Sequence, residues 1–289
     1  MSGPTMVRLA GDRLHFQHGP IDLIVSADGP FDAVEAAYAR GWKRFERILD
    51  ELVAELPLLR TPLGETPPEL RGRTARKMLA AVWPFRERYI TPMAAVAGAV
   101  AEEILEAMTP AIPLTRAMVN NGGDIALYLH KDEKIVVGVS DDPQIAELAG
   151  TVTIRACDPV RGIATSGWRG RSQSLGIADA VTVLARRAAH ADATATMIAN
   201  AVNADHPAIE RRPAREVKDD SDLGDLLVTV GVGGLPTDVV DAALDAGESE
   251  ARLMQAAGLI HGAVLLLKGE VRVIGERTEL LGHDIRLVQ

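Results

Sequence analysis

IATSGWRGRSQSLGIADAVTVLARRAAHADATATMIANAV, residues Ile163–Val202, is the stretch that decides the fold. A short apolar strand runs into a Thr-Ser-Gly turn, a second apolar run follows at Ala180–Ala185, and an alanine-rich helix comes last. Apart from a few polar residues the helix is Ala, Met, Ile and Val, which pack against protein. The stretch therefore predicts two strands and a helix that is largely buried.

The polar residues of that helix gather on one side. At roughly 100° per residue, Asp192, Thr196 and Asn203 fall within a narrow arc, with Asn200 close by. A carboxylate and a hydroxyl four residues apart suit Mg²⁺, which takes oxygen ligands and shares them with phosphate. The alternative is structural, because Asp often serves a helix cap and Thr often bonds its own i−4 carbonyl. The pattern predicts Asp192 and Thr196 as metal ligands, with that structural role as the alternative.

A second polar motif lies upstream, at Asn120-Asn121-Gly122-Gly123-Asp124. Its two glycines permit positive φ and a close approach of backbone N–H groups to a ligand. The side chains of its two Asn and one Asp are suited to form hydrogen bonds with the polar edges and hydroxyl groups of a small molecule. The alternative is an ordinary hairpin turn, because Asn-Gly is a common hairpin signal.

The turn Thr165-Ser166-Gly167 follows a strand, where hydroxyl and N–H groups suit phosphate. Four arginines surround it within seventeen residues, which in an acidic protein indicates an anion nearby, although solvated arginines are common on surfaces. They are Arg155, Arg161, Arg169 and Arg171.

Composition excludes several classes of protein. The 289 residues carry a net charge of −9, and 3% are aromatic, which argues against a nucleic-acid partner. The single cysteine, Cys157, rules out an internal disulfide and a cysteine-cluster metal site. Neither a signal-like apolar segment nor a run long enough to span a membrane is present, so we expect a cytoplasmic protein.

Periodicity and turn signals predict the remaining elements. A hairpin, a third strand and two helices come first, followed by a small-residue helix that allows close approach of another backbone or a ligand. A hairpin of Ile125–His130 with Ile135–Val139 follows, and residues 203–222 are expected to be a loop or lid. The ranges predicted before that hairpin are Met6–Ala10 with Arg13–Gln17, Ile21–Ala27, Phe31–Glu55, Arg73–Val82 and Thr91–Met108.

Three motifs in this order resemble the ApbE family, the FAD:protein FMN transferases once called thiamine-biosynthesis lipoproteins. They are VNNGGDIAL at Val119–Leu127, ATSG at Ala164–Gly167, and the ADATAT that holds Asp192 and Thr196. VAGAVAE at Val96–Glu102 is also similar to a family segment. The resemblance covers about residues 90–202. It implies an α+β fold, ApbE-like (T-fold-like), with antiparallel-rich sheets covered by helices, here as a single domain over 1–289.

The resemblance also implies roles for particular residues. Asp192 and Thr196 would hold Mg²⁺ at a diphosphate, and the two glycine-containing turns would line the pocket of FAD or a related small-molecule nucleotide. The pocket residues are Asn120, Gly122, Gly123, Asp124, Thr165, Ser166 and Gly167, with Asn121 at the family's variable position.

The chain departs from the transferases in one segment. Between ATSG and the valine-rich strand they carry His-x-x-Asp-Pro-x-Thr-Gly, where this chain has RSQSLGIADA. The chain is more similar to an ApbE-like branch marked by TPMAAVAGA and SLGIADAVTVLA, which is loosely linked with sulfur and homocysteine metabolism.

Three functions follow as hypotheses, and none of them has an assigned catalytic residue. The first is a protein that binds a flavin or other nucleotide diphosphate with Mg²⁺ but does not transfer flavin. The second is an accessory protein of sulfur and homocysteine metabolism, and the third is a non-catalytic subunit. The apolar, glycine-rich helices suggest a homodimer.

Overall fold

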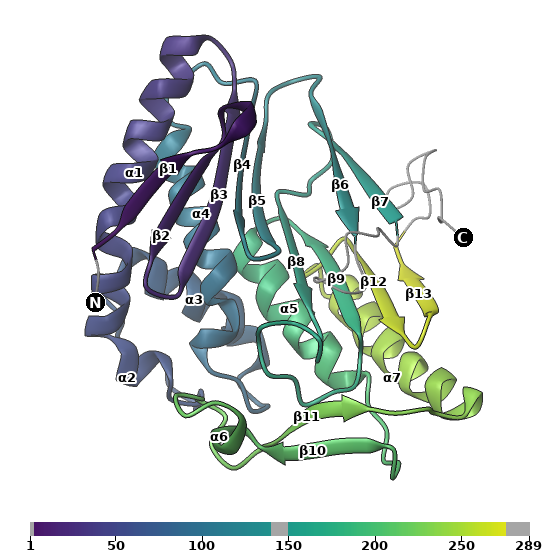
Figure 1. Cartoon of the computed structure of the whole chain (residues 1–289). Coiled ribbons are helices and arrows are strands. Elements are labelled where there is room, and N and C mark those ends of the chain that lie inside the picture. Colours follow the sequence, from purple (N-terminus) through teal and green to yellow (C-terminus); the bar gives the residue numbers. More distant parts are fainter. Residues whose placement is uncertain (1–2, 140–149, 276–289) are drawn as a thin grey trace. The chain divides into compact units, whose positions relative to one another are not determined.

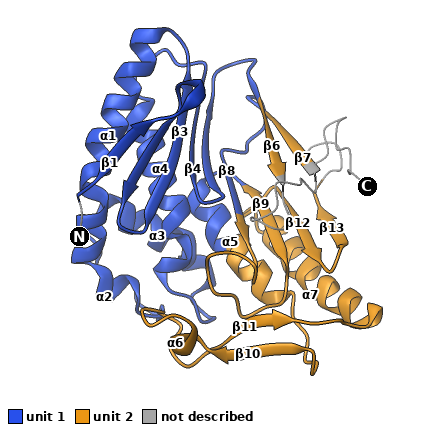
Figure 2. Cartoon of the chain, in the orientation of Figure 1, with its two compact units in different colours: residues 1–134, 155–164, 185–193 blue, residues 135–154, 165–184, 194–289 orange. Residues whose placement is uncertain are grey.

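The computed structural model describes residues 3–139 and 150–275, and the chain forms two units (Figure 2). Unit 1 consists of residues 1–134, 155–164 and 185–193, and unit 2 of residues 135–154, 165–184 and 194–289. Each unit combines helices with antiparallel strands, which confirms the predicted α+β class. The prediction of a single domain over 1–289 stays a prediction.

The elements of unit 1 come mainly from the N-terminal part of the chain (Figure 1). They are β1 (Thr5–Arg8), η1 (Ala10–Asp12), β2 (Leu14–His18), β3 (Ile21–Asp28), α1 (Phe31–Ala54), α2 (Leu56–Leu59), α3 (Arg73–Val82), η2 (Trp83–Phe85), η3 (Pro92–Ala95), α4 (Val96–Met108), β4 (Arg116–Asn121) and β5 (Asp124–Leu129), where η marks a 3₁₀ helix.

The elements of unit 2 lie mainly in the C-terminal part. They are β10 (Ile209–Pro213), α6 (Ala214–Val217), β11 (Leu227–Val232), α7 (Thr237–Ala256), β12 (Gly262–Leu267) and β13 (Glu270–Ile274). Elements with residues in both units are β6 (Lys134–Val139), β7 (Gly150–Arg155), β8 (Gly162–Ser166), β9 (Ala180–Ala185) and α5 (Ala188–Ala201).

In unit 1, β1 to β5 form consecutive antiparallel pairs, and β5 also pairs with the start of β8. Alternate residues of the strands are buried, as Leu23 and Val25 of β3 show. The buried positions Phe45, Ile48 and Leu52 lie along one face of α1. Helices α1 and α4 pack against each other and against these strands (Figure 1), which places the start of α4 beside the β4–β5 turn.

In unit 2, β12 pairs with both β9 and β13, and β10 pairs with β11. Every residue of β9 and β12 is buried, as expected for inner strands with both faces covered. Helix α7 packs on β12 and β13. Glycine is needed at position 247 of α7 for this close packing, because a Cβ there would lie 2.9 Å from the side chain of Leu265.

Three predictions about local structure were wrong. Ile125–His130 does not pair with Ile135–Val139, because both edges of β5 are used by β4 and β8, while β6 pairs with β7. Residues 203–222 contain the strand β10 and the helix α6 rather than only a loop. The helix predicted from Thr91 begins as the 3₁₀ helix η3, and α4 starts at Val96.

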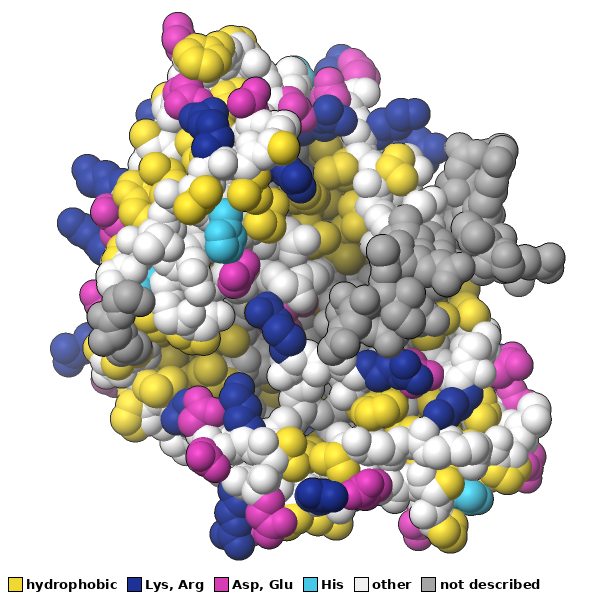
Figure 3. All heavy atoms as spheres, viewed as in Figure 1, with side chains coloured by type: hydrophobic (Ala, Val, Ile, Leu, Met, Phe, Trp, Pro, Cys, Tyr) yellow, Lys and Arg dark blue, Asp and Glu magenta, His cyan; other side chains and the backbone are white. Residues whose placement is uncertain are grey.

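The surface carries both signs of charge. On the face drawn in Figure 3, acidic and basic side chains are interspersed. No helix in the described ranges is long and apolar enough to cross a bilayer.

Candidate nucleotide and metal site

The start of α4 has a cap supplied by a residue far along the chain. No side chain of α4's own N-terminal residues accepts a hydrogen bond there. The N–H of Gly98 instead donates to Asp192 Oδ2 at 2.9 Å, and the N–H of Ala97 also bonds to this carboxylate. The first N–H groups of a helix lack partners inside the helix, so a carboxylate is a suitable acceptor. Asp192 thus caps a helix, as its structural alternative predicted, but the capped helix is α4 rather than its own.

Glycines allow α4 and α5 to approach each other this closely. A Cβ on Gly98 would lie under 3.0 Å from the carbonyl of Ala188, the first residue of α5. Gly162 of β8 lies against the start of α5 in the same way, because a Cβ on it would lie 2.3 Å from the backbone N of Ala188. Such separations are shorter than real Cβ contacts. The small residues of α4 therefore serve the approach of another backbone, one of the two roles predicted for them.

The NNGGD motif forms the turn between β4 and β5. Gly122 and Gly123 are the two loop residues, with φ of 66° and 110°, and Asn121 is opposite Asp124 in the register. The N–H of Gly123 donates to Asn120 Oδ1 at 2.8 Å. A Cβ on Gly123 would meet no atom within 4 Å. The motif is a hairpin turn, and its second glycine leaves open space next to the backbone.

Asn121 connects this turn to α4. Its side chain is buried, and its Nδ2 donates to the carbonyl of Ala97 at 3.2 Å. Ala97 thus receives one hydrogen bond from Asn121 and donates another to Asp192. Within unit 1 the structure brings the NNGGD turn, the VAGAVAE helix and Asp192 together, although they are distant in sequence.

The other predicted site residues belong to unit 2. Thr165 Oγ1 lies 2.9 Å from Thr182 Oγ1, and Ser166 ends β8. A Cβ on Gly167 would lie 2.5 Å from the carbonyl oxygen of Asp179, so close backbone approach requires a glycine. Thr196 is half-buried on α5. The assembly of these residues with those of unit 1 into one pocket stays a prediction.

Protein partners satisfy the remaining polar residues near the end of α5. Asn200 Oδ1 accepts from the N–H of Leu175 at 3.0 Å. Asn203 follows the end of the helix, and its Nδ2 donates to the carbonyl of Leu175 at 3.2 Å. This half of the polar stripe fixes the segment before β9 and needs no ligand.

Two of the four arginines near the Thr-Ser-Gly turn also have protein partners. The guanidinium of Arg161 donates to the carbonyls of Ala156 and Asp158 at 2.6 and 2.7 Å. Arg169 Nε donates to Asp179 Oδ1 at 2.8 Å. Asp179 also accepts from Trp168 Nε1 at 3.0 Å and from the N–H of Lys268 at 2.6 Å. In the sequence Asp179 is marked only as an acid inside an apolar run, and no motif predicted it as a site residue.

A buried acidic pair on α4 was also missed. Glu102 and Glu103 are 7% and 1% exposed. Glu102 bonds to Arg187, and Glu103 Oε1 accepts from Arg44 Nε at 2.8 Å. Lys77 Nζ lies 3.4 Å from an oxygen of each carboxylate. Buried carboxylates need such partners. Two adjacent acids in a helical sequence do not by themselves indicate burial, so the sequence did not predict this pair.

Asp192 differs from this pair because no Lys or Arg in the described ranges forms an ion pair with it. The described residues also contain no group of three or more His, Cys, Asp or Glu side chains able to hold a metal. Burial raises the pKa of the Asp192 carboxyl to about 7, although the N–H groups of Gly98 and Ala97 act to lower it. Burial, and then Arg187, lower the pKa of nearby His190, which favours its neutral form.

The raised pKa of Asp192 predicts a pH dependence of stability without metal. The unfolded carboxyl titrates near its ordinary value of about 4. Between about pH 4 and 7 the folded state therefore binds more protons than the unfolded state, and this contribution to stability falls as the pH rises. We expect the melting temperature of wild type, relative to Asp192→Asn, to decrease from pH 5 to pH 8 in EDTA. A constant difference across this range would contradict the expectation.

Comparison with known proteins agrees with this class of α+β protein. The family model described as “AbpE bacteria” matches residues 6–273, and the chain therefore belongs to that ApbE-like family.

Two relatives are UPF0280 proteins of archaea. One, from Methanopyrus kandleri, is 36% identical over 233 residues, covering 76% of this chain and 89% of the relative. The other, from Methanothrix thermoacetophila, is 38% identical over 161 residues, covering 54% and 65%. Among solved structures, the fold is similar to that of the ApbE protein from Thermotoga maritima. The TM-score is 0.52 at 12% identity, with 94% and 97% of the two chains covered.

Proposed function

We propose that this protein binds a flavin or another nucleotide diphosphate together with Mg²⁺, and that it does not transfer FMN to other proteins. Membership of the ApbE-like family supports the nucleotide, because the motifs NNGGD, ATSG and ADATAT resemble the nucleotide-binding motifs of that family. The proposal includes the predicted pocket residues of both units.

The main support for a bound metal ion is the set of groups that bond to the carboxylate of Asp192. Its carboxylate accepts hydrogen bonds from backbone N–H groups, but no cation of the described chain is paired with it. A carboxylate has room for a further partner beside those hydrogen bonds. Mg²⁺ binds through one or two protein oxygens when phosphate oxygens supply the rest, so Asp192 with Thr196 fits this mode. When bound, the ion would neutralise charge on the diphosphate.

The hydrogen bonds of three side chains support the loss of FMN transfer. Two of these side chains follow the ATSG turn, and the third follows α5. The only carboxylate in residues 168–179 is Asp179, and its three donors occupy both oxygens. Gln173 donates to the carbonyl of Ala214 at 2.8 Å. His206, in the segment after α5, accepts from the N–H of Ala208 at 3.1 Å through Nδ1. None of these groups is poised to activate an acceptor hydroxyl.

The test of the proposed function has two readouts. We expect FAD with Mg²⁺ to raise the melting temperature, because a ligand that binds only the folded state stabilises it. We expect no FMN mass increment on a transferase acceptor domain incubated with the protein, FAD and Mg²⁺. A genuine transferase serves as the positive control. A clear increment would refute the loss of transfer, whereas the absence of any thermal shift would favour a non-catalytic subunit.

A further inference from the structure

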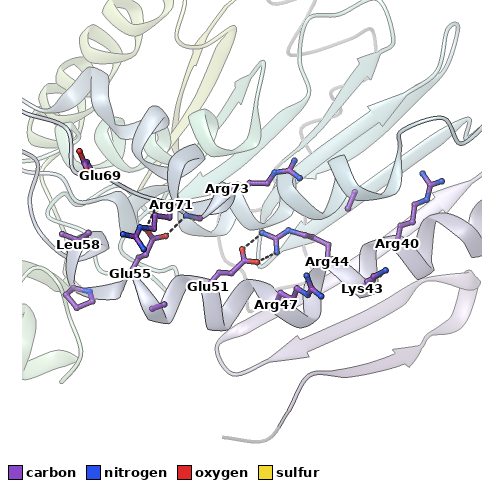
Figure 4. Close-up of a pocket in the computed structure, with 14 residues that line it drawn as sticks. Arg40, Lys43, Arg44, Arg47, Glu51, Glu55, Leu58, Glu69, Arg71 and Arg73 are labelled. Atoms are coloured by element: carbon purple, nitrogen blue, oxygen red, sulfur yellow. Dashed lines mark hydrogen bonds and ion pairs between the residues drawn. The ribbon is translucent and has the colours of Figure 1, made fainter.

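A basic groove lies in unit 1 between α1 and the segment before α3. It has a volume of about 1030 Å³, at the upper end of small-molecule sites. Arg40, Lys43, Arg44 and Arg47 of α1 line one side (Figure 4). They follow one another at intervals of one or three residues, and two pairs of like charges, Arg40 with Arg44 and Lys43 with Arg47, lie four residues apart. Such pairs repel each other on a helix.

The opposite side is held in place by Glu55. Its two carboxylate oxygens accept from the N–H groups of Arg71 and Gly72 at 2.6 and 2.8 Å. A Cβ on Gly72 would lie 2.7 Å from the same carboxylate, so a larger residue would force this contact apart. The side that carries Arg71 and Arg73 is therefore fixed against α1 by specific hydrogen bonds.

The carboxylates of the groove do not balance its cations. Six Lys or Arg and three Glu line it. Both oxygens of Glu51 are bonded to Arg44, at 2.9 and 2.6 Å, and Glu55 is used by backbone N–H groups. In the described part of the chain no carboxylate forms an ion pair with Lys43, Arg47 or the Arg71 side chain. This surplus of positive charge occurs in a protein whose net charge is −9.

The groove also has an apolar part. Ala54, Pro57, Leu58 and Ala107 contribute to its lining, and Leu58 is 43% exposed. We propose that this groove binds a small phosphate-bearing anion that has a short apolar portion. Lys43, Arg47 and Arg71 would contact the phosphate groups, and Leu58 the apolar portion. Multiple cations around a fixed hollow favour phosphate, which offers several charged oxygens at once. The groove shares no residue with the nucleotide site proposed above.

The test uses inorganic pyrophosphate as the probe, titrated calorimetrically in EDTA at low salt. The chelator removes the metal-dependent site from the measurement. We expect the double variant Lys43→Glu with Arg47→Glu to bind at least about tenfold more weakly than wild type. Both side chains are exposed, so the fold is expected to persist, and melting curves check this. Lys131→Glu, an exposed cation in the turn after β5, is the matched control and is expected to bind like wild type.

Three results would overturn the proposal. They are wild-type affinity in the double variant, the absence of binding by wild type at millimolar pyrophosphate, and an equal loss in Lys131→Glu. Tighter binding of a hexaglutamate peptide than of pyrophosphate would identify the groove instead as a docking surface for acidic proteins. Asp192→Asn is expected to leave pyrophosphate binding in EDTA unchanged. The titration therefore tests the groove alone, and a failure of the proposed nucleotide site would appear only in the melting curves with FAD and Mg²⁺.

Discussion

Gly98→Val is expected to destabilise the protein by about 3 kcal/mol or more, because the new side chain would overlap the backbone at the start of α5. A Cβ alone would lie under 3.0 Å from the Ala188 carbonyl, and backbone cannot move aside as a flexible side chain can. Separating the two helices would also break the hydrogen bond from Gly98 to Asp192. The melting temperature should fall by about 6 °C or more.

Gly64→Val is the matched control. Gly64 lies in the loop before α3, its Cβ would meet no atom within 4 Å, and its φ is not positive. Thermal melts of both variants should therefore differ clearly. Equal melting temperatures for Gly98→Val and Gly64→Val would show that α4 and α5 are not packed as closely as described.

Asp192→Asn is expected to abolish the Mg²⁺-dependent part of nucleotide binding while keeping the fold. The amide oxygen of Asn can still accept from the N–H of Gly98, so the cap on α4 is preserved. The carboxylate charge, which the proposed metal needs, is lost. At a ligand concentration of about 100 Kd the wild type gains about 2.7 kcal/mol of stability, whereas the variant should gain almost none.

Melting curves with FAD, with and without Mg²⁺, measure this difference. Asp50→Asn, an exposed residue of α1, is the control and should respond like wild type. Asp192→Ala removes both the charge and the cap, so it should also lose about 0.5–2 kcal/mol of stability before any ligand is added. An equal response to Mg²⁺ in wild type and Asp192→Asn would rule out this carboxylate as a metal ligand.

Elements with strong local signals could be predicted from the sequence. The boundaries of Arg73–Val82 and Ala180–Ala185 agree with α3 and β9, because the Trp83-Pro84 step ends the helix and a wholly apolar run marks the buried strand. The pairing of β5 could not be predicted in this way. Its sequence suits either neighbour, and the choice depends on which strand reaches its free edge in the folded chain.

In the candidate site, too, contacts between distant segments could not be predicted from the sequence. The helical stripe identified Asp192 as a polar group in apolar surroundings, and the structure gives that group a partner. The partner is a backbone N–H on another helix, and no side-chain pattern reports where a backbone N–H will lie. Arg161, one of the arginines near ATSG, shows a related limit, since its guanidinium bonds to backbone carbonyls that no sequence motif marks.

The cap on α4 has a consequence for synthesis of the chain. Residues 98 and 192 are separated by 94 positions, so the ribosome completes α4 long before it adds the carboxylate that α4 requires. The cap on the first turn of α4 must await a segment that emerges much later. Contacts of such long range are slow to form, and the nascent chain would expose this apolar helix in the interval. Unit 1 is therefore expected to mature only after translation has passed α5, although most of its residues come from the first half of the chain.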